Sequence, residues 1–223
     1  MTVANKVREI YLAAMEIPEP YCNLSDTEQE QARELLSRFE DLQTKHGSVP
    51  HADLLHPMLL SKCGRHDDAL AVTERHHQDS PDWESAVAVA NAARRAGDLD
   101  RAAAMFQSAA GYDATDVTCW LEIGDIRLAQ GRCEEALNAY EVALDKEPEH
   151  QWALPSAFYC RDRLGHDGNW LQSLREVANQ QGCTCGMQGC LTSLFGGYGS
   201  EDGIARARFL LSQIDGESAS SGS

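Results

Sequence analysis

Apolar residues recur at three- and four-residue intervals along much of the chain, the spacing that places them on one face of an α-helix. Segment 117–148 shows the pattern most clearly. Its apolar and small positions are Trp120, Ile123, Gly124 and Leu128, then Ala136, Tyr140 and Ala143. Gly131 separates the two sets, and a glycine there suits the left-handed turn that reverses a chain. The pattern predicts a first helix through Leu128 and a second over 134–144, packed together through these positions.

The same arrangement repeats along the sequence. Glycines recur at a nearly constant interval, at Gly64, Gly97, Gly131 and Gly165. Alanines follow the first three of them at one fixed offset, at Ala69, Ala102 and Ala136. A fixed period of about 34 residues indicates one helix-turn-helix unit that is stacked on itself.

The unit at 117–148 resembles a tetratricopeptide repeat (TPR). The residues that match the family pattern are Trp120, Gly124, Ala136, Tyr140, Ala143 and Pro148. The resemblance covers 49–181, with units at about 50–82, 83–116 and 117–150 and a degenerate unit at 151–181. Two units depart from the pattern: Pro57 falls inside the first helix of the first unit, and Trp170 replaces a small residue in the last. The resemblance implies an all-α, right-handed solenoid of helix-turn-helix repeats that binds other proteins.

Segment 1–48 is helical in pattern but does not follow the repeat. Apolar spacing from Val3 to Ala14 predicts a short helix that ends before Pro18. Ser25 and Glu28 predict a capping box that begins a second helix, ending near residue 45. We expect the two helices to cap the first repeat. The alternative is that one of them lies in the groove or mediates dimerisation.

The charge balance bears on the class of partner. The 223 residues include 35 acidic and 19 basic ones, for a formal net charge of −16. This balance disfavours nucleic-acid phosphates and anionic membranes, which both require a basic surface, and it favours a basic protein or peptide. An alternative is that the acidity only keeps the chain soluble. Without a secretory signal or an apolar run of bilayer length, we expect a cytoplasmic protein.

The resemblance also implies where a partner binds, because first-helix residues of this family face the concave groove. The corresponding positions here are Asn91, Arg94, Leu121, Glu122, Asp125, Trp152, Tyr159 and Asp162. Only Asn91 and Arg94 match the residues with which some family members clamp a C-terminal carboxylate, and Glu122 and Asp125 would repel one. The mixture of apolar and acidic side chains therefore predicts a partner segment with apolar and basic residues.

Within 182–215 we expect a cysteine- and glycine-rich loop after the repeats and then a last helix, followed by a disordered tail at 216–223. The loop holds Cys183, Cys185 and Cys190. Three thiolates this close are able to bind zinc, although the spacing differs from that of Cys-x-x-Cys zinc sites. A reversible disulfide and a plain reduced loop are the alternatives. We interpret Cys63, Cys119, Cys133 and Cys160 as small apolar residues of the repeat helices.

The sequence contains none of the motifs searched for in enzymes, namely a P-loop, a dinucleotide fingerprint, a nucleophile elbow or an HExxH pair. Histidines crowd the first repeat, but we expect them to be surface residues of a polar helix. We therefore expect a non-catalytic adaptor or dedicated chaperone, without a cofactor unless the cysteine loop binds zinc. Two alternatives stay open: an immunity- or inhibitor-type protein that covers a basic enzyme such as a toxin, and a metal- or thiol-dependent protein.

Overall fold

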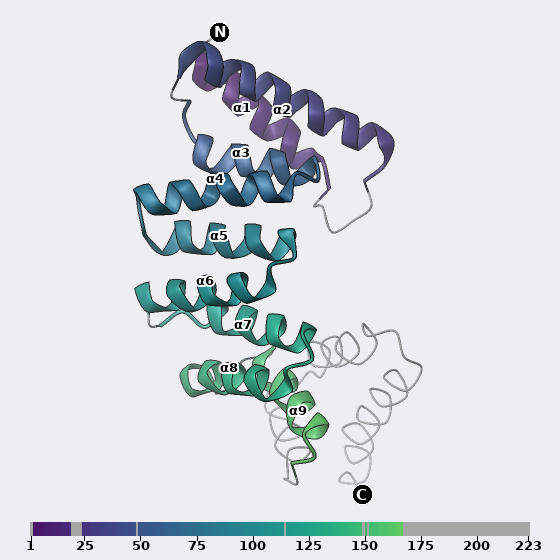
Figure 1. Cartoon of the computed structure of the whole chain (residues 1–223), viewed down its shortest axis with the longest axis vertical. Coiled ribbons are helices and arrows are strands. Elements are labelled where there is room, and N and C mark those ends of the chain that lie inside the picture. Colours follow the sequence, from purple (N-terminus) through teal and green to yellow (C-terminus); the bar gives the residue numbers. More distant parts are fainter. Residues whose placement is uncertain are drawn as a thin grey trace, which may run out of the picture. The chain divides into compact units, whose positions relative to one another are not determined.

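The computed structural model describes residues 2–18, 24–47, 49–113, 115–148, 150 and 152–166. Within these ranges every regular element is an α-helix, which confirms the predicted all-α fold class. The helices, labelled in Figure 1, are α1 (Val3–Glu16), α2 (Asp26–His46), α3 (Ala52–Lys62), α4 (His66–Asp79), α5 (Trp83–Ala96), α6 (Leu99–Tyr112), α7 (Thr118–Ala129), α8 (Cys133–Lys146) and α9 (Ala153–Arg163). None of these described helices is both long and apolar enough to cross a bilayer.

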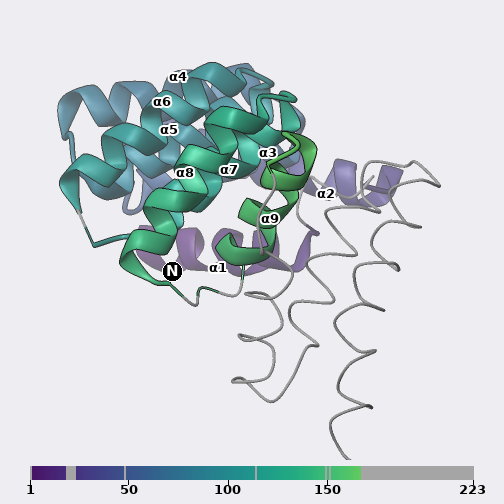
Figure 2. The ribbon, with the colours of Figure 1, turned by 90° about the horizontal axis from the view of Figure 1, so that it is seen from below.

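The helices belong to two compact units. Unit 1, Met1–Asp113, carries α1 to α6, and unit 2, Ala114–Ser223, carries α7 to α9. In unit 1 each helix packs on the next one in sequence, from α1 through to α6 (Figure 1). Viewed from below the stack, α1 and α4 lie on opposite sides of this unit (Figure 2). In unit 2, α8 packs on both α7 and α9.

The repeating glycines end the first helix of each pair. Their φ angles are 73° at Gly64, 85° at Gly97, 75° at Gly131 and 69° at Gly165. At one of these turns the Gly97 amide donates to the Arg94 carbonyl (3.1 Å) and the Asp98 amide donates to the Ala93 carbonyl (2.9 Å). These two bonds define a Schellman motif, and the same pair closes the turns at the other three glycines. The glycine period read from the sequence therefore marks a real structural repeat.

Gly124 allows a close approach between α7 and α8 in unit 2. A methyl group added at its Cα would lie 2.7 Å from Cδ1 of Tyr140, which is fully buried on α8. The sequence predicted that Gly124 lets these helices meet. The structure adds that the aromatic ring of Tyr140 lies directly against the glycine.

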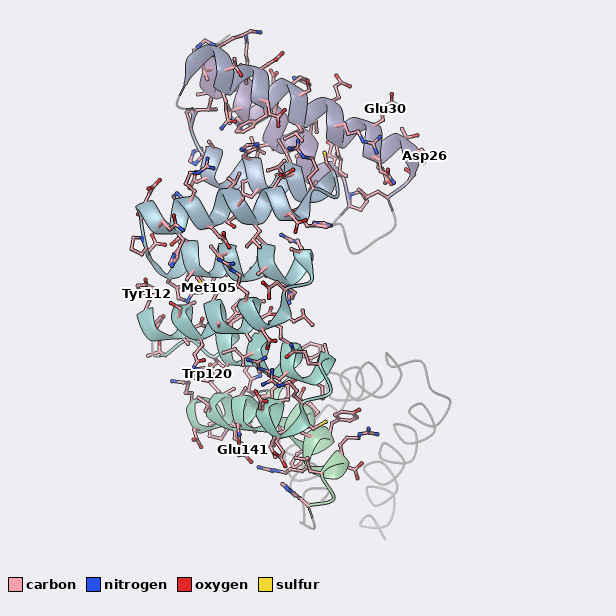
Figure 3. The ribbon with its side chains drawn as sticks, in the orientation of Figure 1. Asp26, Glu30, Met105, Tyr112, Trp120 and Glu141 are labelled. Atoms are coloured by element: carbon pink, nitrogen blue, oxygen red, sulfur yellow. The ribbon has the colours of Figure 1, made fainter. Side chains whose placement is uncertain are left out.

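The N-terminal helices share one hydrophobic core with α3. Ile10 of α1, Phe39 of α2 and Leu59 of α3 are all buried within it. The predicted capping box is present: the Ser25 amide donates to Oε2 of Glu28 (2.7 Å) and the Glu28 amide donates to Oγ of Ser25 (3.3 Å). Figure 3 labels Asp26 and Glu30 on the first turns of α2, next to this cap. The helix boundaries predicted within 1–48 agree closely with the observed ones.

Several predictions concern residues beyond the described ranges. They include the effect of Trp170 on the degenerate fourth unit, the last helix within 182–215 and the tail at 216–223. Of the fourth unit, α9 and its closing turn at Gly165 are described.

Candidate functional site

A pocket of about 310 Å³ opens in unit 1 where α3, α4 and α5 meet. Its apolar lining consists of Leu54, Pro57, Met58, Ala88 and Ala92. Its polar lining consists of Asp53, Ser61, Lys62, Thr73, Asn91 and Arg95. Leu54 is 58 % exposed, an unusual degree for a leucine beside a cavity. An apolar hollow with a few polar groups is the composition typical of a binding site.

Helical spacing explains why these residues lie together. The α3 side of the pocket uses Leu54, Pro57, Met58 and Ser61, and the α5 side uses Ala88, Asn91, Ala92 and Arg95. Both sets follow i, i+3, i+4, i+7, so each helix contributes a single face. Counted from Gly64 and Gly97, which are 33 residues apart, each member of the second set lies one position further along its helix than the corresponding member of the first. The pocket is therefore made by single faces of two successive first helices, and the small Ala88 and Ala92 leave it open.

Lys62 connects this pocket to the end of α1. The side chain is only 3 % exposed, and its Nζ donates to the carbonyl oxygens of Ile17 (2.7 Å) and Pro18 (3.2 Å). Hydrogen bonds from an ammonium group to helix-terminal carbonyls are charge-assisted and favourable. The contact fixes the C-terminal end of α1 beside the wall of the pocket.

Of the pair predicted from the first repeat helices, Asn91 lines the pocket and Arg94 lies next to it in space. Nη2 of Arg94 donates to Oδ1 of Asn91 at 3.1 Å. The basic residues that line the pocket are Lys62 and Arg95, neither of which was predicted from the sequence. The repeat register is the signal that connects them, since each lies two positions before the glycine of its repeat.

The remaining predicted groove residues belong to unit 2. Carrying the pocket-lining register of unit 1 forward by one repeat period selects Glu122 and Asp125 on α7, and a further period selects Tyr159 on α9. Asp125 is exposed, whereas Glu122 and Tyr159 are partly buried. The hydroxyl of Tyr140 donates to Oδ1 of Asp125 at 2.6 Å. Burial and the neighbouring Asp125 carboxylate both raise the pKa of Tyr140, so this phenol stays protonated and remains a donor.

The other three residues lie outside that register. Leu121 is partly buried and packs on two core clusters of unit 2, so it contributes to the interior. Trp152 precedes α9 and is 49 % exposed. Asp162 is partly buried on α9, close after Tyr159 in sequence. Tyr159 also packs on a core cluster, and burial raises the pKa of its hydroxyl.

The cysteine loop with Cys183, Cys185 and Cys190 lies outside the described residues. Within the described ranges no three His, Cys, Asp or Glu side chains are grouped so as to hold a metal ion. Cys119 and Cys160 are buried free thiols, and Cys63 and Cys133 are partly buried ones, in keeping with the apolar role predicted for all four. Burial raises the pKa of Cys160 to about 12, so this thiol is not a nucleophile at neutral pH.

Comparisons with known proteins place these helices among repeat structures. A family model described as anaphase-promoting complex, cyclosome, subunit 3 (ANAPC3) matches residues 62–143. No curated protein matches the chain. A crystal structure of MamA is 11 % identical, with a TM-score of 0.59, and the alignment covers 81 % of this chain and 94 % of MamA.

Two further solved structures give the same result. MamA from Desulfovibrio magneticus RS-1 is 11 % identical, with a TM-score of 0.58, and the alignment covers 81 % of this chain and 97 % of that one. YrrB, described as a TPR protein with an unusual peptide-binding site, is 13 % identical, with a TM-score of 0.53, and the alignment covers 80 % and 93 %. At these identities the likeness concerns the fold.

Proposed function

Because the chain is built from tetratricopeptide-like repeats, we propose that it is an adaptor or dedicated chaperone that binds a partner segment carrying apolar and basic side chains. Repeats of this kind are protein-interaction scaffolds that usually lack catalytic activity. The observation that carries the proposal is the pocket between α3, α4 and α5. It is formed by residues on single faces of consecutive first helices, so the proposed binding surface exists before the partner arrives.

The pocket suits one apolar side chain of the partner. Its hollow is bounded by Leu54, Pro57, Met58, Ala88 and Ala92, and Leu54 offers a large exposed contact at the edge. Burying an apolar side chain there removes its surface from water at a gain of about 25 cal/mol per Å². Because the walls belong to packed helices, little ordering entropy opposes binding.

The basic character of the partner follows from charge. Glu122 and Asp125 occupy, in unit 2, the repeat positions that Ala88 and Asn91 occupy in the pocket of unit 1. The formal net charge of −16 attracts a cationic segment over a longer range. We propose that Asn91, Arg94, Glu122, Asp125, Trp152, Tyr159 and Asp162 contribute contacts with the partner, and that Leu121 acts through packing beneath them.

Filling the pocket tests this proposal. The protein is used to capture its partner from cells that express it, and the affinity of the purified pair is measured by calorimetry. Ala88→Phe places a ring in the pocket and should weaken binding by about tenfold or more. Ala104→Phe, at an exposed position of α6, is the matched control and should leave the affinity unchanged. Equal affinities for the two variants would show that the pocket is not the binding site.

Charge reversal tests the acidic positions separately. Glu122→Lys combined with Asp125→Lys should abolish binding of a basic partner, because each substitution replaces attraction with repulsion. Retention of the partner with unchanged affinity would remove both residues from the proposed surface.

The overall acidity also supports a second candidate, an immunity- or inhibitor-type protein that covers a basic enzyme. The two candidates differ in what is bound. A synthetic peptide from an adaptor's partner should compete with the whole partner at similar concentration, whereas a folded enzyme held over a wide surface should not be displaced by any of its own short peptides.

A metal- or thiol-dependent role would rest on Cys183, Cys185 and Cys190. Elemental analysis of the purified protein tests it, because a structural zinc site binds close to one equivalent and loses stability when chelated. Metal below about a tenth of an equivalent, with unchanged thermal stability in chelator, would end the metal form of this candidate. Replacing the three cysteines with serine tests the redox form, which predicts loss of function.

A further inference from the structure

One buried hydroxyl in unit 2 reaches an exposed carboxylate. Tyr140 belongs to α8 and is fully buried, in a core cluster shared by α7, α8 and α9. Its ring lies against Gly124, where any side chain would collide with it, and its hydroxyl donates to Oδ1 of Asp125 at 2.6 Å. Asp125, which directly follows Gly124 in the sequence, is therefore the residue that the Tyr140 hydroxyl binds.

The preceding repeat shows what this pairing adds. The residue equivalent to Tyr140 is Phe106, which lacks a hydroxyl, and the residue equivalent to Asp125 is Asn91. Asn91 is held by Arg94 instead, and it lines the pocket of unit 1 together with Met58, the equivalent residue of the first repeat. The repeat with the phenol carries an acid at this position, and the preceding repeat, which has Phe106, carries an amide. The position itself faces the pocket in the unit where a pocket is formed.

We propose that Asp125 is a recognition point for an arginine or lysine side chain of the partner segment, and that Tyr140 is its positioning residue. This inference rests on the proposed function and adds the residue that binds the cationic side chain of the partner. Asp125 is exposed, and the buried phenol fixes the direction of its carboxylate. A short hydrogen bond to an ionised oxygen is among the stronger polar contacts in proteins, and a fixed carboxylate loses less freedom when a cation binds.

Two small probes test the charge directly on the full chain. N-acetyl-arginine amide carries the guanidinium, and N-acetyl-citrulline amide is its neutral counterpart of nearly equal shape. Each is titrated while NMR follows the Asp125 carboxylate carbon and the amides of α7 and α9. We expect saturable shifts around Asp125 with the arginine probe at millimolar concentration and much smaller ones with citrulline. Equal responses to both probes would overturn the proposal.

Three variants assign the roles. Asp125→Asn should lower the affinity for the arginine probe by about threefold or more, with no change for citrulline. Tyr140→Phe keeps the aromatic ring but removes the hydroxyl. It should lower the affinity for the arginine probe by about two- to threefold and also shift the carboxylate NMR signal of Asp125. Asp145→Asn, at an exposed position of α8, removes the same charge and should match the unaltered protein. If Tyr140 has only a structural role, Tyr140→Phe should leave the ratio of the affinities for the arginine and citrulline probes unchanged. That result would show that Tyr140 is not a positioning residue.

The failure of this inference can be told apart from failure of the proposed function. If Ala88→Phe abolishes partner binding while Asp125→Asn and Tyr140→Phe leave it intact, the adaptor function stands and the cation site is wrong. If none of the three variants changes partner affinity, the binding surface itself lies elsewhere.

Discussion

Single residues decide how closely the helices of unit 2 approach. Gly124 has no side chain at the point where Tyr140 crosses α7, and the phenol reaches the surface of α7 only because of that gap. Trp120 and Leu144 pack against a neighbouring cluster of the buried residues Val117, Ala143 and Ala153. Figure 3 labels Trp120 on α7 and Glu141 on α8, and Glu141 accepts a hydrogen bond from Nη2 of Arg161 on α9 at 2.8 Å. One small residue therefore controls both packing and the position of Asp125.

Adding a methyl group at Gly124 should destabilise the protein. Gly124→Ala forces Cβ into the Tyr140 ring, and overpacking of this kind costs about 1–3 kcal/mol. Gly111→Ala is the control, because a Cβ at this helical position of α6 meets nothing within 4 Å. We expect Gly111→Ala to be neutral or slightly stabilising in urea unfolding. Equal unfolding free energies for the two variants would contradict the packing described here.

His56 makes the free energy of unfolding depend on pH. Burial between α2 and α3 lowers its pKa from the ordinary value of 6.5, although the nearby Glu40 partly opposes the shift. The pKa of His56 is lower in the folded state than in the unfolded state. Its contribution to the free energy of unfolding is therefore fully present above pH 6.5 and is lost as the pH falls through the folded-state pKa. His56→Gln should therefore lose less unfolding free energy than the unaltered protein between about pH 7 and pH 5. The exposed His46→Gln is the control, and identical pH profiles for both variants would refute this assignment.

At the scale of the helices, the turns are the features that the sequence predicts most directly. Each first helix ends at a glycine with positive φ, closed by the same two backbone bonds. This conformation is a local property of the backbone, which is why the glycine period alone predicted the helix pairs. The N-terminal helix boundaries were predictable for the same reason, since the capping residues Ser25 and Glu28 are close in sequence.

The turn at Gly97 tests this point. Its φ is 85° and a Cβ there meets no neighbour, so any cost of substitution comes from the backbone. Gly97→Ala should lower the free energy of unfolding by about 1–2 kcal/mol, and Gly97→Asn should lower it less because asparagine tolerates the left-handed region. Thermal unfolding followed by circular dichroism measures both. A neutral Gly97→Ala would mean that the α5–α6 turn is not fixed as described.

The candidate site was less predictable than the fold. Which residues face the pocket depends on how each helix is rotated against its neighbours, and one position of error moves a side chain by about 100° around the helix. Of the two predicted residues Asn91 and Arg94, only Asn91 lines the pocket, and Arg95 lines it without having been predicted. Lys62 could not be found from sequence, because its partners at Ile17 and Pro18 belong to a distant helix end.

At the scale of the whole molecule, charge is the dominant property. A net charge of −16 produces an attractive field for a basic partner, and mobile ions screen such a field over about 8 Å at physiological ionic strength. Apolar burial in the pocket is not screened in this way. Charge should therefore govern the rate of encounter and the pocket should govern how long the complex lasts.

The salt dependence of binding separates these contributions. Raising the ionic strength from about 20 mM to about 300 mM should slow association with the partner by about tenfold or more, with a much smaller change in dissociation. Stopped-flow measurements give both rates. An association rate that is independent of salt would exclude electrostatic attraction as the source of partner selection.

Position-specific crosslinking tests the central claim, that the partner segment binds at the pocket of α3 and α5. A photoreactive phenylalanine replaces Leu54, 58 % exposed at the pocket, or Leu12, 54 % exposed on α1, and the protein is irradiated in cells that express it. We expect that the reagent at Leu54 crosslinks to the partner, that Ala88→Phe suppresses this product, and that the reagent at Leu12 gives none. A partner crosslinked equally from both positions, or only from Leu12, would contradict it.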